Sequence, residues 1–192
     1  RKVAAGLEAW TKRSQVYPYP IYVQVEPTSR CNLNCIMCPR QRDLTDHSDM
    51  TMKEYSKVLD EANPLYVNLT GYGEPLLNSE IFKMIEESKR RGIYVNMSSN
   101  FTLLRQSEAT RLVQSGIDLV KLSLDAATPE TYRKIRGDNS LELVVNHALF
   151  FSRLAHRVGG AAFQMVCVLQ RDNIHEVDEI VGLAKTIGAD YL

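Results

Sequence analysis

The apolar and polar positions of the chain change their period from one segment to the next. Five segments alternate between apolar and polar residues and predict strands over residues 21–26, 65–70, 93–98, 118–124 and 161–169. The segments between them have helical spacing and capping signals, and predict helices over residues 51–62, 79–91, 107–114, 128–137, 140–158 and 173–188. Alternating strands and helices require a parallel sheet with right-handed crossovers. We therefore predict an α/β fold, with residues 189–192 beginning a sixth strand.

One face of each predicted strand is polar, although parallel strands covered on both sides are apolar at nearly every position. The polar positions are Gln24, Glu26, Asn68, Thr70, Asn96, Ser98, Asn100, Lys121, Ser123, Asp125 and Gln164. Helices are expected to cover the apolar face, so the polar face must line water or a ligand. A curved, barrel-like sheet with a polar lumen fits better than a half-solvated antiparallel sheet, because helices separate the strands. We expect Lys121 to pair with Glu26 or another carboxylate of the lumen.

Length and charge exclude several classes of protein. At 192 residues the chain is about one domain. Its 23 Lys and Arg residues equal its 23 Asp and Glu residues, so no net field favours nucleic acid or an anionic membrane. No apolar run approaches the roughly 20 residues of a membrane span. We divide the chain into an N-terminal extension, residues 1–17, which we expect to be helical, and a core domain, residues 18–192.

Three of the four cysteines, Cys31, Cys35 and Cys38, follow the first strand with the spacing C-x3-C-x2-C. Such clustering indicates a metal site in a reducing cytoplasm and not a disulfide framework. Thiolates suit zinc and iron–sulfur clusters. A closed zinc site needs four protein ligands, whereas a [4Fe–4S] cluster held by three cysteines leaves one iron open. No fourth ligand lies nearby, because the next histidine is His47 and Cys167 is expected to be a small buried residue of the fifth strand.

Polar or glycine-rich residues also follow the next three strands. Gly71-Tyr72-Gly73-Glu74-Pro75 follows the second, Ser98 to Asn100 ends the third, and Ser123 and Asp125 end the fourth. Functional groups of parallel α/β folds gather at the carboxyl ends of the strands. These residues and the cysteines are therefore predicted to surround one mouth of the fold.

Together these motifs resemble the radical S-adenosylmethionine (radical SAM) superfamily. The C-x3-C-x2-C segment resembles its cluster motif, and Gly73-Glu74-Pro75 is similar to its GGE motif, with Tyr72 in place of the first glycine. Ser98-Ser99-Asn100 and Leu122-Ser123-Leu124-Asp125 resemble its ribose-contacting strand ends. The resemblance implies an enzyme in place of a purely structural metal protein.

Two further segments, Val25-Glu26-Pro27-Thr28 and residues 125–132, look like the SPASM/twitch branch of that superfamily. The resemblance covers residues 20–192. It implies a partial (β/α)6 TIM-like barrel whose sixth strand is truncated at the C-terminus, so we expect the chain to be a fragment or to be partly ordered.

The resemblance also implies a role for each matching residue. The three cysteines would hold a [4Fe–4S] cluster, and its open iron would chelate the amino and carboxylate groups of SAM. The reduced cluster would donate one electron to the sulfonium, releasing methionine and a 5′-deoxyadenosyl radical that abstracts hydrogen from a substrate. The implied contact for the ammonium is Glu74, with the backbone around Gly73, in a turn that Pro75 stiffens. The other implied cofactor contacts are Met37 at the adenine, where the family often has an aromatic residue, Ser98, Asn100, Ser123 and Asp125 at the ribose, and Arg136 at the carboxylate.

The implied enzyme is cytoplasmic and acts on a peptide, a sugar or another small molecule. It takes electrons from a donor such as flavodoxin or ferredoxin, and neither nucleic acid nor membrane is an expected partner. The motifs do not choose between oxidoreductase, lyase and transferase. The alternative is a zinc-stapled α/β module that binds or stabilises without catalysis.

Overall fold

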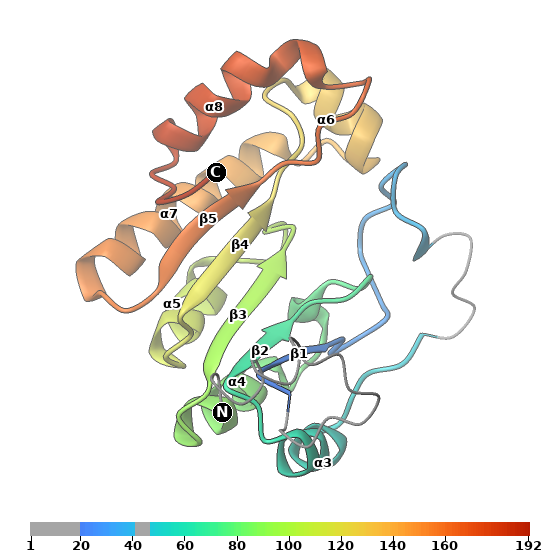
Figure 1. Cartoon of the computed structure of the whole chain (residues 1–192). Helices are drawn as coiled ribbons and strands as arrows, with labels where there is room; N and C mark the ends of the chain where they lie inside the picture. The colour runs from blue at the N-terminus through green and yellow to red at the C-terminus, as the bar shows by residue number, and fades with distance from the viewer. Residues whose placement is uncertain (1–19, 41–46) are drawn as a thin grey trace, which may run out of the picture.

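The described residues, 20–40 and 47–192, form one open sheet of parallel strands in this computed structural model (Figure 1). The strands are β1 (Tyr22–Val25), β2 (Tyr66–Leu69), β3 (Tyr94–Ser99), β4 (Leu119–Ser123) and β5 (Ala162–Val166). They are hydrogen-bonded in the order β1-β2-β3-β4-β5, each parallel to its neighbour. This confirms the predicted α/β fold and brings the segments after the strands to the same edge of the sheet.

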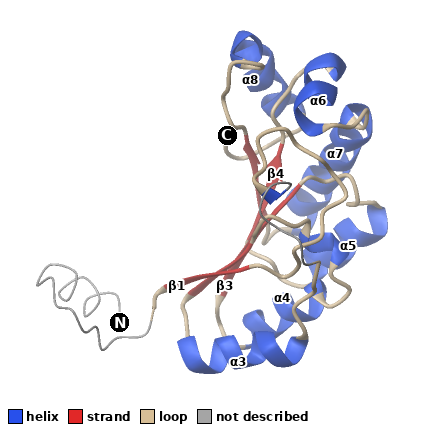
Figure 2. Ribbon diagram, turned by 90° about the vertical axis from the view of Figure 1, so that its right-hand side faces the viewer, coloured by secondary structure: helices blue, strands red, loops and turns tan. Residues whose placement is uncertain are grey.

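Helices connect the strands and lie together on one side of the sheet, which Figure 2 shows nearly edge-on. They are α3 (Met52–Ala62), α4 (Ile81–Arg90), α5 (Gln106–Gln114), α6 (Pro129–Arg136), α7 (Leu141–Val158) and α8 (Val177–Thr186), with short 3-10 helices η1 (Pro75–Leu77) and η2 (Ile174–Glu176). The predicted capping box begins α3: Glu54 N donates to Thr51 Oγ1 at 3.3 Å and Thr51 N donates to Glu54 Oε2 at 2.8 Å. Gly137 ends α6 at a φ of 73°, a left-handed conformation that suits glycine.

The apolar face of the strands forms the core with these helices. Met97, Val120 and Phe163 lie side by side on β3, β4 and β5 and are fully buried. The ring of Phe163 also stacks on Phe101, with centroids 5.7 Å apart, and meets Phe151 of α7 at 5.5 Å. Phe101 has a φ of 61°, which is unfavourable for a bulky residue, and its burial offsets that cost. The core therefore fixes the turn that follows Ser98 to Asn100.

The opposite face carries the predicted polar residues, with graded exposure. Gln24 is exposed, Lys121 and Gln164 are partly buried, and Asn68 and Asn96 are buried. The helices of the described part of the chain leave this face uncovered (Figure 2). It therefore has the character of a barrel lumen.

The expected ion pair of Lys121 is not formed: no salt bridge joins Lys121 to Glu26 or to any other described residue. Glu26 instead accepts hydrogen bonds from the backbone N–H groups of Tyr72 and Gly73. The carboxylate therefore holds the turn after β2.

The last residues begin to add a sixth strand, as predicted. Tyr191 forms a parallel bridge with Gln164 of β5. The expected end of the fifth strand at residue 169 is wrong, because β5 ends at Val166, whereas the last helix forms as expected, with η2 leading from Asn173 directly into α8. Cys167 follows β5 and is partly exposed, so its expected burial within the strand is also wrong.

Asn173 explains the early end of β5. Its side-chain Nδ2 donates to the carbonyl oxygens of Asp125 and Val168, both at 2.9 Å. This ties the segment after β5 to the end of β4 and turns the chain away from the sheet.

The predicted helical extension, residues 1–17, lies outside the described residues, so the domain boundary at residue 18 stays a prediction. Within the described part of the chain, no helix is both long enough and apolar enough to cross a bilayer.

Candidate active site at the carboxyl ends of the strands

The cysteines lie on the loop that follows β1, and polar contacts fix this loop at both ends. At its start, Thr28 Oγ1 and Arg30 Nε donate to Asp49 Oδ1 at 2.6 and 2.9 Å. Further along, Ile36 N donates to the carbonyl oxygen of Ile135 in the last turn of α6 at 2.9 Å. The loop is therefore held between the segment that leads into α3 and the end of α6.

Gly73 packs directly against the base of the cysteine loop. A Cβ at this position would lie 1.9 Å from the carbonyl oxygen of Thr28 and 2.7 Å from that of Arg30. Both are backbone atoms that cannot move aside cheaply. The next residue, Glu74, donates its N–H to the carbonyl oxygen of Arg30 at 2.8 Å. The protein itself therefore requires glycine here, because a side chain would separate the turn from the loop.

The carboxylate of Glu74 is buried, 2% exposed, and points into the space between the cysteine loop and β3. It accepts from Ser99 Oγ at 2.7 Å, Asn100 N at 2.8 Å and Leu76 N at 3.2 Å. Burial raises the pKa of Glu74, and the hydrogen bonds from Asn100 and Ser99 oppose this rise. Glu74 forms no ion pair with a described residue, although the charge of Arg136 also opposes the rise in its pKa.

Asn100 uses its side chain to hold the cysteine loop. Its Nδ2 donates to Asn32 Oδ1 at 3.0 Å, and its Oδ1 accepts from Thr102 N at 2.9 Å and Thr102 Oγ1 at 2.6 Å. Asn32 Nδ2 in turn donates to Thr102 Oγ1 at 2.7 Å. These bonds connect the end of β3 to the residue after the first cysteine. A ribose contact by Asn100 stays a prediction.

Arg136 and Asp125 form a buried ion pair beside the cysteines. Arg136 Nη2 lies 2.5 Å from Asp125 Oδ2, and the two side chains are 9% and 1% exposed. Arg136 Nη1 also donates to Cys35 Sγ at 3.7 Å.

Pro75 is the first residue of η1 and is buried. Neither Asp125 nor Pro75 is among the residues that line the cavity described next, and direct cofactor contact by either stays a prediction.

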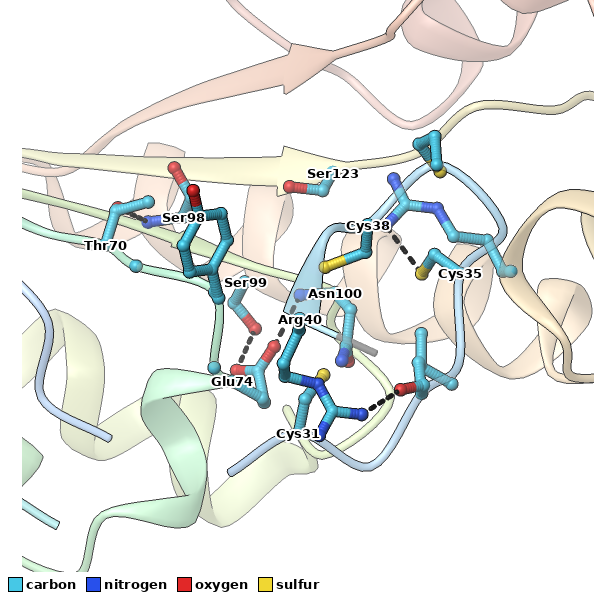
Figure 3. Close-up of a pocket in the computed structure, with 16 residues that line it drawn as sticks. Cys31, Cys35, Cys38, Arg40, Thr70, Glu74, Ser98, Ser99, Asn100 and Ser123 are labelled. Atoms are coloured by element: carbon cyan, nitrogen blue, oxygen red, sulfur yellow. Dashed lines mark hydrogen bonds between the residues drawn. The ribbon is translucent and has the colours of Figure 1, made fainter. Parts of the chain in front are cut away.

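One cavity of about 180 Å³ gathers most of the predicted residues. Figure 3 shows the cysteine loop on one side of it and the strand ends, with Glu74, Ser98 and Ser123, on the other. The residues that line it are Cys31, Leu33, Cys35, Met37, Cys38, Arg40, Thr70, Gly71, Tyr72, Gly73, Glu74, Ser98, Ser99, Asn100, Ser123 and Arg136. The three cysteines and seven of the nine predicted cofactor contacts are therefore in one place.

Sequence reasoning missed several lining residues. Ser99 has the apolar parity of β3, so alternation gave no reason to select it, yet it donates to Glu74. Arg40 follows Cys38 and Pro39 directly, and this proximity could have marked it as a cation near the cluster motif. Its Nη2 donates to the carbonyl oxygen of Leu33 at 3.1 Å.

The three thiols share one cavity, and two of them have a cation nearby. Burial raises the pKa values of Cys31 and Cys35, while Arg40 near Cys31 and Arg136 near Cys35 favour the thiolates. All three thiols line one cavity. Among the described residues, however, no three Cys, His, Asp or Glu side chains surround a position for one metal ion.

A sequence comparison assigns the family. The model of the radical SAM superfamily matches residues 25–184, which is most of the chain. The chain belongs to the radical SAM superfamily. Members of this superfamily are enzymes that use a [4Fe–4S] cluster and SAM, so the cofactors implied by the motifs are confirmed for the family, and the zinc alternative is not favoured.

Curated relatives agree with the branch expected from the sequence. The chain is 30% identical over 173 residues to mycofactocin maturase MftC of Mycobacterium tuberculosis, covering 88% of this chain and 43% of that protein. It is 30% identical over 177 residues to PqqA peptide cyclase of Streptomyces rochei, covering 90% and 47%. Both belong to the SPASM/twitch-type branch. The chain thus spans less than half the length of these two relatives.

Solved structures confirm the fold. Streptococcus suis SuiB bound to S-adenosylmethionine superposes with a TM-score of 0.77 at 17% identity, over 99% of this chain and 43% of that one. Native anSMEcpe with bound AdoMet superposes with a TM-score of 0.72 at 24% identity, over 89% and 50%. The open sheet of five parallel strands is therefore a partial TIM-like radical SAM barrel.

Proposed function

We propose that this chain is the catalytic core of an enzyme that cleaves SAM reductively and uses the resulting radical to abstract hydrogen from a substrate. One observation carries the proposal: the three cysteine thiols, the Glu74 carboxylate and the hydroxyls at the strand ends line one cavity. A purely structural metal site would not need a buried carboxylate without an ion pair, such as Glu74, or the two hydroxyls of Ser98 and Ser123 beside it.

The bound cluster and SAM would supply the one-electron chemistry. Cys31, Cys35 and Cys38 would hold the cluster and leave one iron without a protein ligand. Glu74 would accept hydrogen bonds from the ammonium of SAM, a charge-assisted contact made in a buried site. Met37, which lines the cavity, would pack its thioether against the adenine.

The hydroxyls of Ser98 and Ser123 face the same cavity from β3 and β4. Neither hydroxyl has a hydrogen-bond partner among the described residues, so both are open to a ligand such as the ribose. Arg136, which also lines the cavity, is the predicted contact for the carboxylate of SAM.

We infer that the substrate is a peptide. The relatives include a peptide cyclase, and the fold matches SuiB bound to its precursor peptide SuiA with a TM-score of 0.77. The uncovered polar face of the sheet beside the cavity offers amide and amine side chains, such as Gln24, Lys121 and Gln164, to a peptide backbone. A flavodoxin or ferredoxin would supply electrons, and a cysteine cluster that binds metal is typical of proteins in the reducing cytoplasm.

Release of 5′-deoxyadenosine from SAM under anaerobic, reducing conditions tests the proposed activity. Wild-type protein should release it, and the Cys31→Ala variant should not. Cys167→Ala is the matched control, because Cys167 lies outside the cavity and should be dispensable. A wild type that releases no more than Cys31→Ala, or a colourless protein with one tightly bound zinc, would refute the proposal.

A further inference from the structure

Arg136 is a buried cation that joins a cysteine of the cluster motif to a buried carboxylate. Its Nη1 donates to Cys35 Sγ, a contact drawn dashed in Figure 3, and its Nη2 faces Asp125. Cys31 receives a backbone hydrogen bond from Leu33, which is uncharged. Among the described residues, Cys35 is thus the one cysteine of the motif that receives a guanidinium hydrogen bond.

Protein contacts hold Arg136 in this position from two sides. Asp125 Oδ1 accepts from Val168 N at 2.8 Å, and the carbonyl oxygen of Asp125 accepts from Asn173 Nδ2 at 2.9 Å. The helix that ends at Arg136 also receives the N–H of Ile36, next to Cys35, on its last turn. The guanidinium is therefore placed against Cys35 by the fold and does not depend on a bound cofactor.

We propose that Arg136 is a positioning residue that donates to the Cys35 thiolate and raises the reduction potential of the cluster; this inference rests on the proposed function. Reduction makes the cluster more negative, and a hydrogen-bonded cation at a ligating sulfur stabilises that state. Asp125 faces the guanidinium as its ion-pair partner and holds a negative charge on the side away from Cys35.

This role differs from the SAM-carboxylate contact implied by the family motifs. A residue that binds SAM alone should leave the potential of the SAM-free cluster unchanged. A residue that donates to Cys35 acts whether or not SAM is present. Arg136 Nε is buried without a hydrogen-bond partner among the described residues, so a further acceptor could still bind there. The two roles are separated by measuring the potential without SAM.

The test is a redox titration, followed by electron paramagnetic resonance, of the anaerobically reconstituted full chain without SAM. The Cys31→Ala variant identifies the signal of this cluster. Arg136→Gln should shift the reduction equilibrium about tenfold toward the oxidised form, which is a potential about 59 mV lower for one electron. The matched control is Arg133→Gln, which removes the same charge from an exposed position on α6 and should leave the potential unchanged.

A second variant controls for misfolding, because Arg136→Gln leaves Asp125 as a buried charge without an ion-pair partner. The double variant Arg136→Met with Asp125→Asn removes both charges and should also lower the potential. An unchanged or raised potential in the iron-loaded variants overturns the inference, as does a weaker affinity for SAM with no change in potential. If the wild type binds no cluster or does not cleave SAM, the proposed function fails instead.

Discussion

Replacing Glu74 with glutamine separates a role in SAM binding from a role in folding. The carboxylate is buried, accepts three hydrogen bonds, and has no ion pair within the described residues. The ammonium of SAM would be its cationic partner. Glutamine has nearly the same shape but no charge, so it keeps the packing and loses the charge-assisted contact.

The expected loss of affinity follows from the energy of that contact. A hydrogen bond to a charged group contributes about 1.5–3 kcal/mol, and about 1.4 kcal/mol is a tenfold change in affinity. Glu74→Gln should therefore raise the Kd for SAM by roughly 10- to 100-fold. A loss of this size is well above the error of an equilibrium binding measurement.

The effect on folding should be smaller, because two contributions oppose each other. Burial raises the pKa of Glu74, so this group favours the folded state at low pH and that contribution is lost as the pH rises through the folded pKa. Removing the charge relieves this cost at neutral pH. The amide NH2 group of glutamine, however, takes the place of an oxygen that accepts a hydrogen bond in the wild type. Two donors then face each other, at a cost of about 1–3 kcal/mol. We expect the free energy of unfolding to change by less than about 2 kcal/mol.

Equilibrium binding of SAM to the anaerobically reconstituted protein, measured at several pH values, is the assay. Wild-type affinity should fall as the pH is lowered through the raised pKa of Glu74, because protonation removes the charge that binds the ammonium. The variant should bind weakly and without this pH dependence. Glu86→Gln, at an exposed position of α4, is the matched control. Binding by Glu74→Gln within twofold of wild type, with the same pH profile, would refute the assigned role.

Two further substitutions test the support of the cysteine loop. Gly73→Ala should displace the loop and lower the iron content of the reconstituted protein. The control is Gly182→Ala in α8, where a Cβ meets nothing within 4 Å; it should retain iron and raise the free energy of unfolding by up to about 1 kcal/mol. Equal iron content in both variants would contradict the packing argument. Asn32→Ala leaves the buried Asn100 amide without one acceptor and should lower the free energy of unfolding by about 1–3 kcal/mol, measured by denaturant titration. Unchanged stability would show that the Asn32–Asn100 contact contributes little.

The sequence predicted the site well wherever position along a strand decides position in space. In a parallel sheet every strand ends on the same edge, so residues as distant as Cys31 and Ser123 could be placed around one mouth. The polar parity of the strands likewise predicted an uncovered face. These predictions needed only the period of the pattern and the direction of the strands.

Contacts between loops were beyond this reasoning. Asn100 meets Asn32 across 68 residues, and Asp125 meets Arg136 at the far end of α6, a contact that no local pattern specifies. Ser99 was passed over because its parity is apolar, although the strand ends there and its hydroxyl turns to Glu74. The early end of β5 likewise depends on the long-range hydrogen bonds of Asn173.

The distribution of hydrogen bonds around the cavity decides which groups remain for a ligand. Asn100 already uses both ends of its amide within the protein, and Asp125 is committed to Arg136 and Val168. Ser98 and Ser123 face the same cavity with hydroxyls that no described residue engages. Groups locked to one another give a prearranged site and reduce the entropy lost on binding. We therefore expect Ser98 and Ser123 to take the ribose contacts, while Asn100 holds the loop that carries the cysteines.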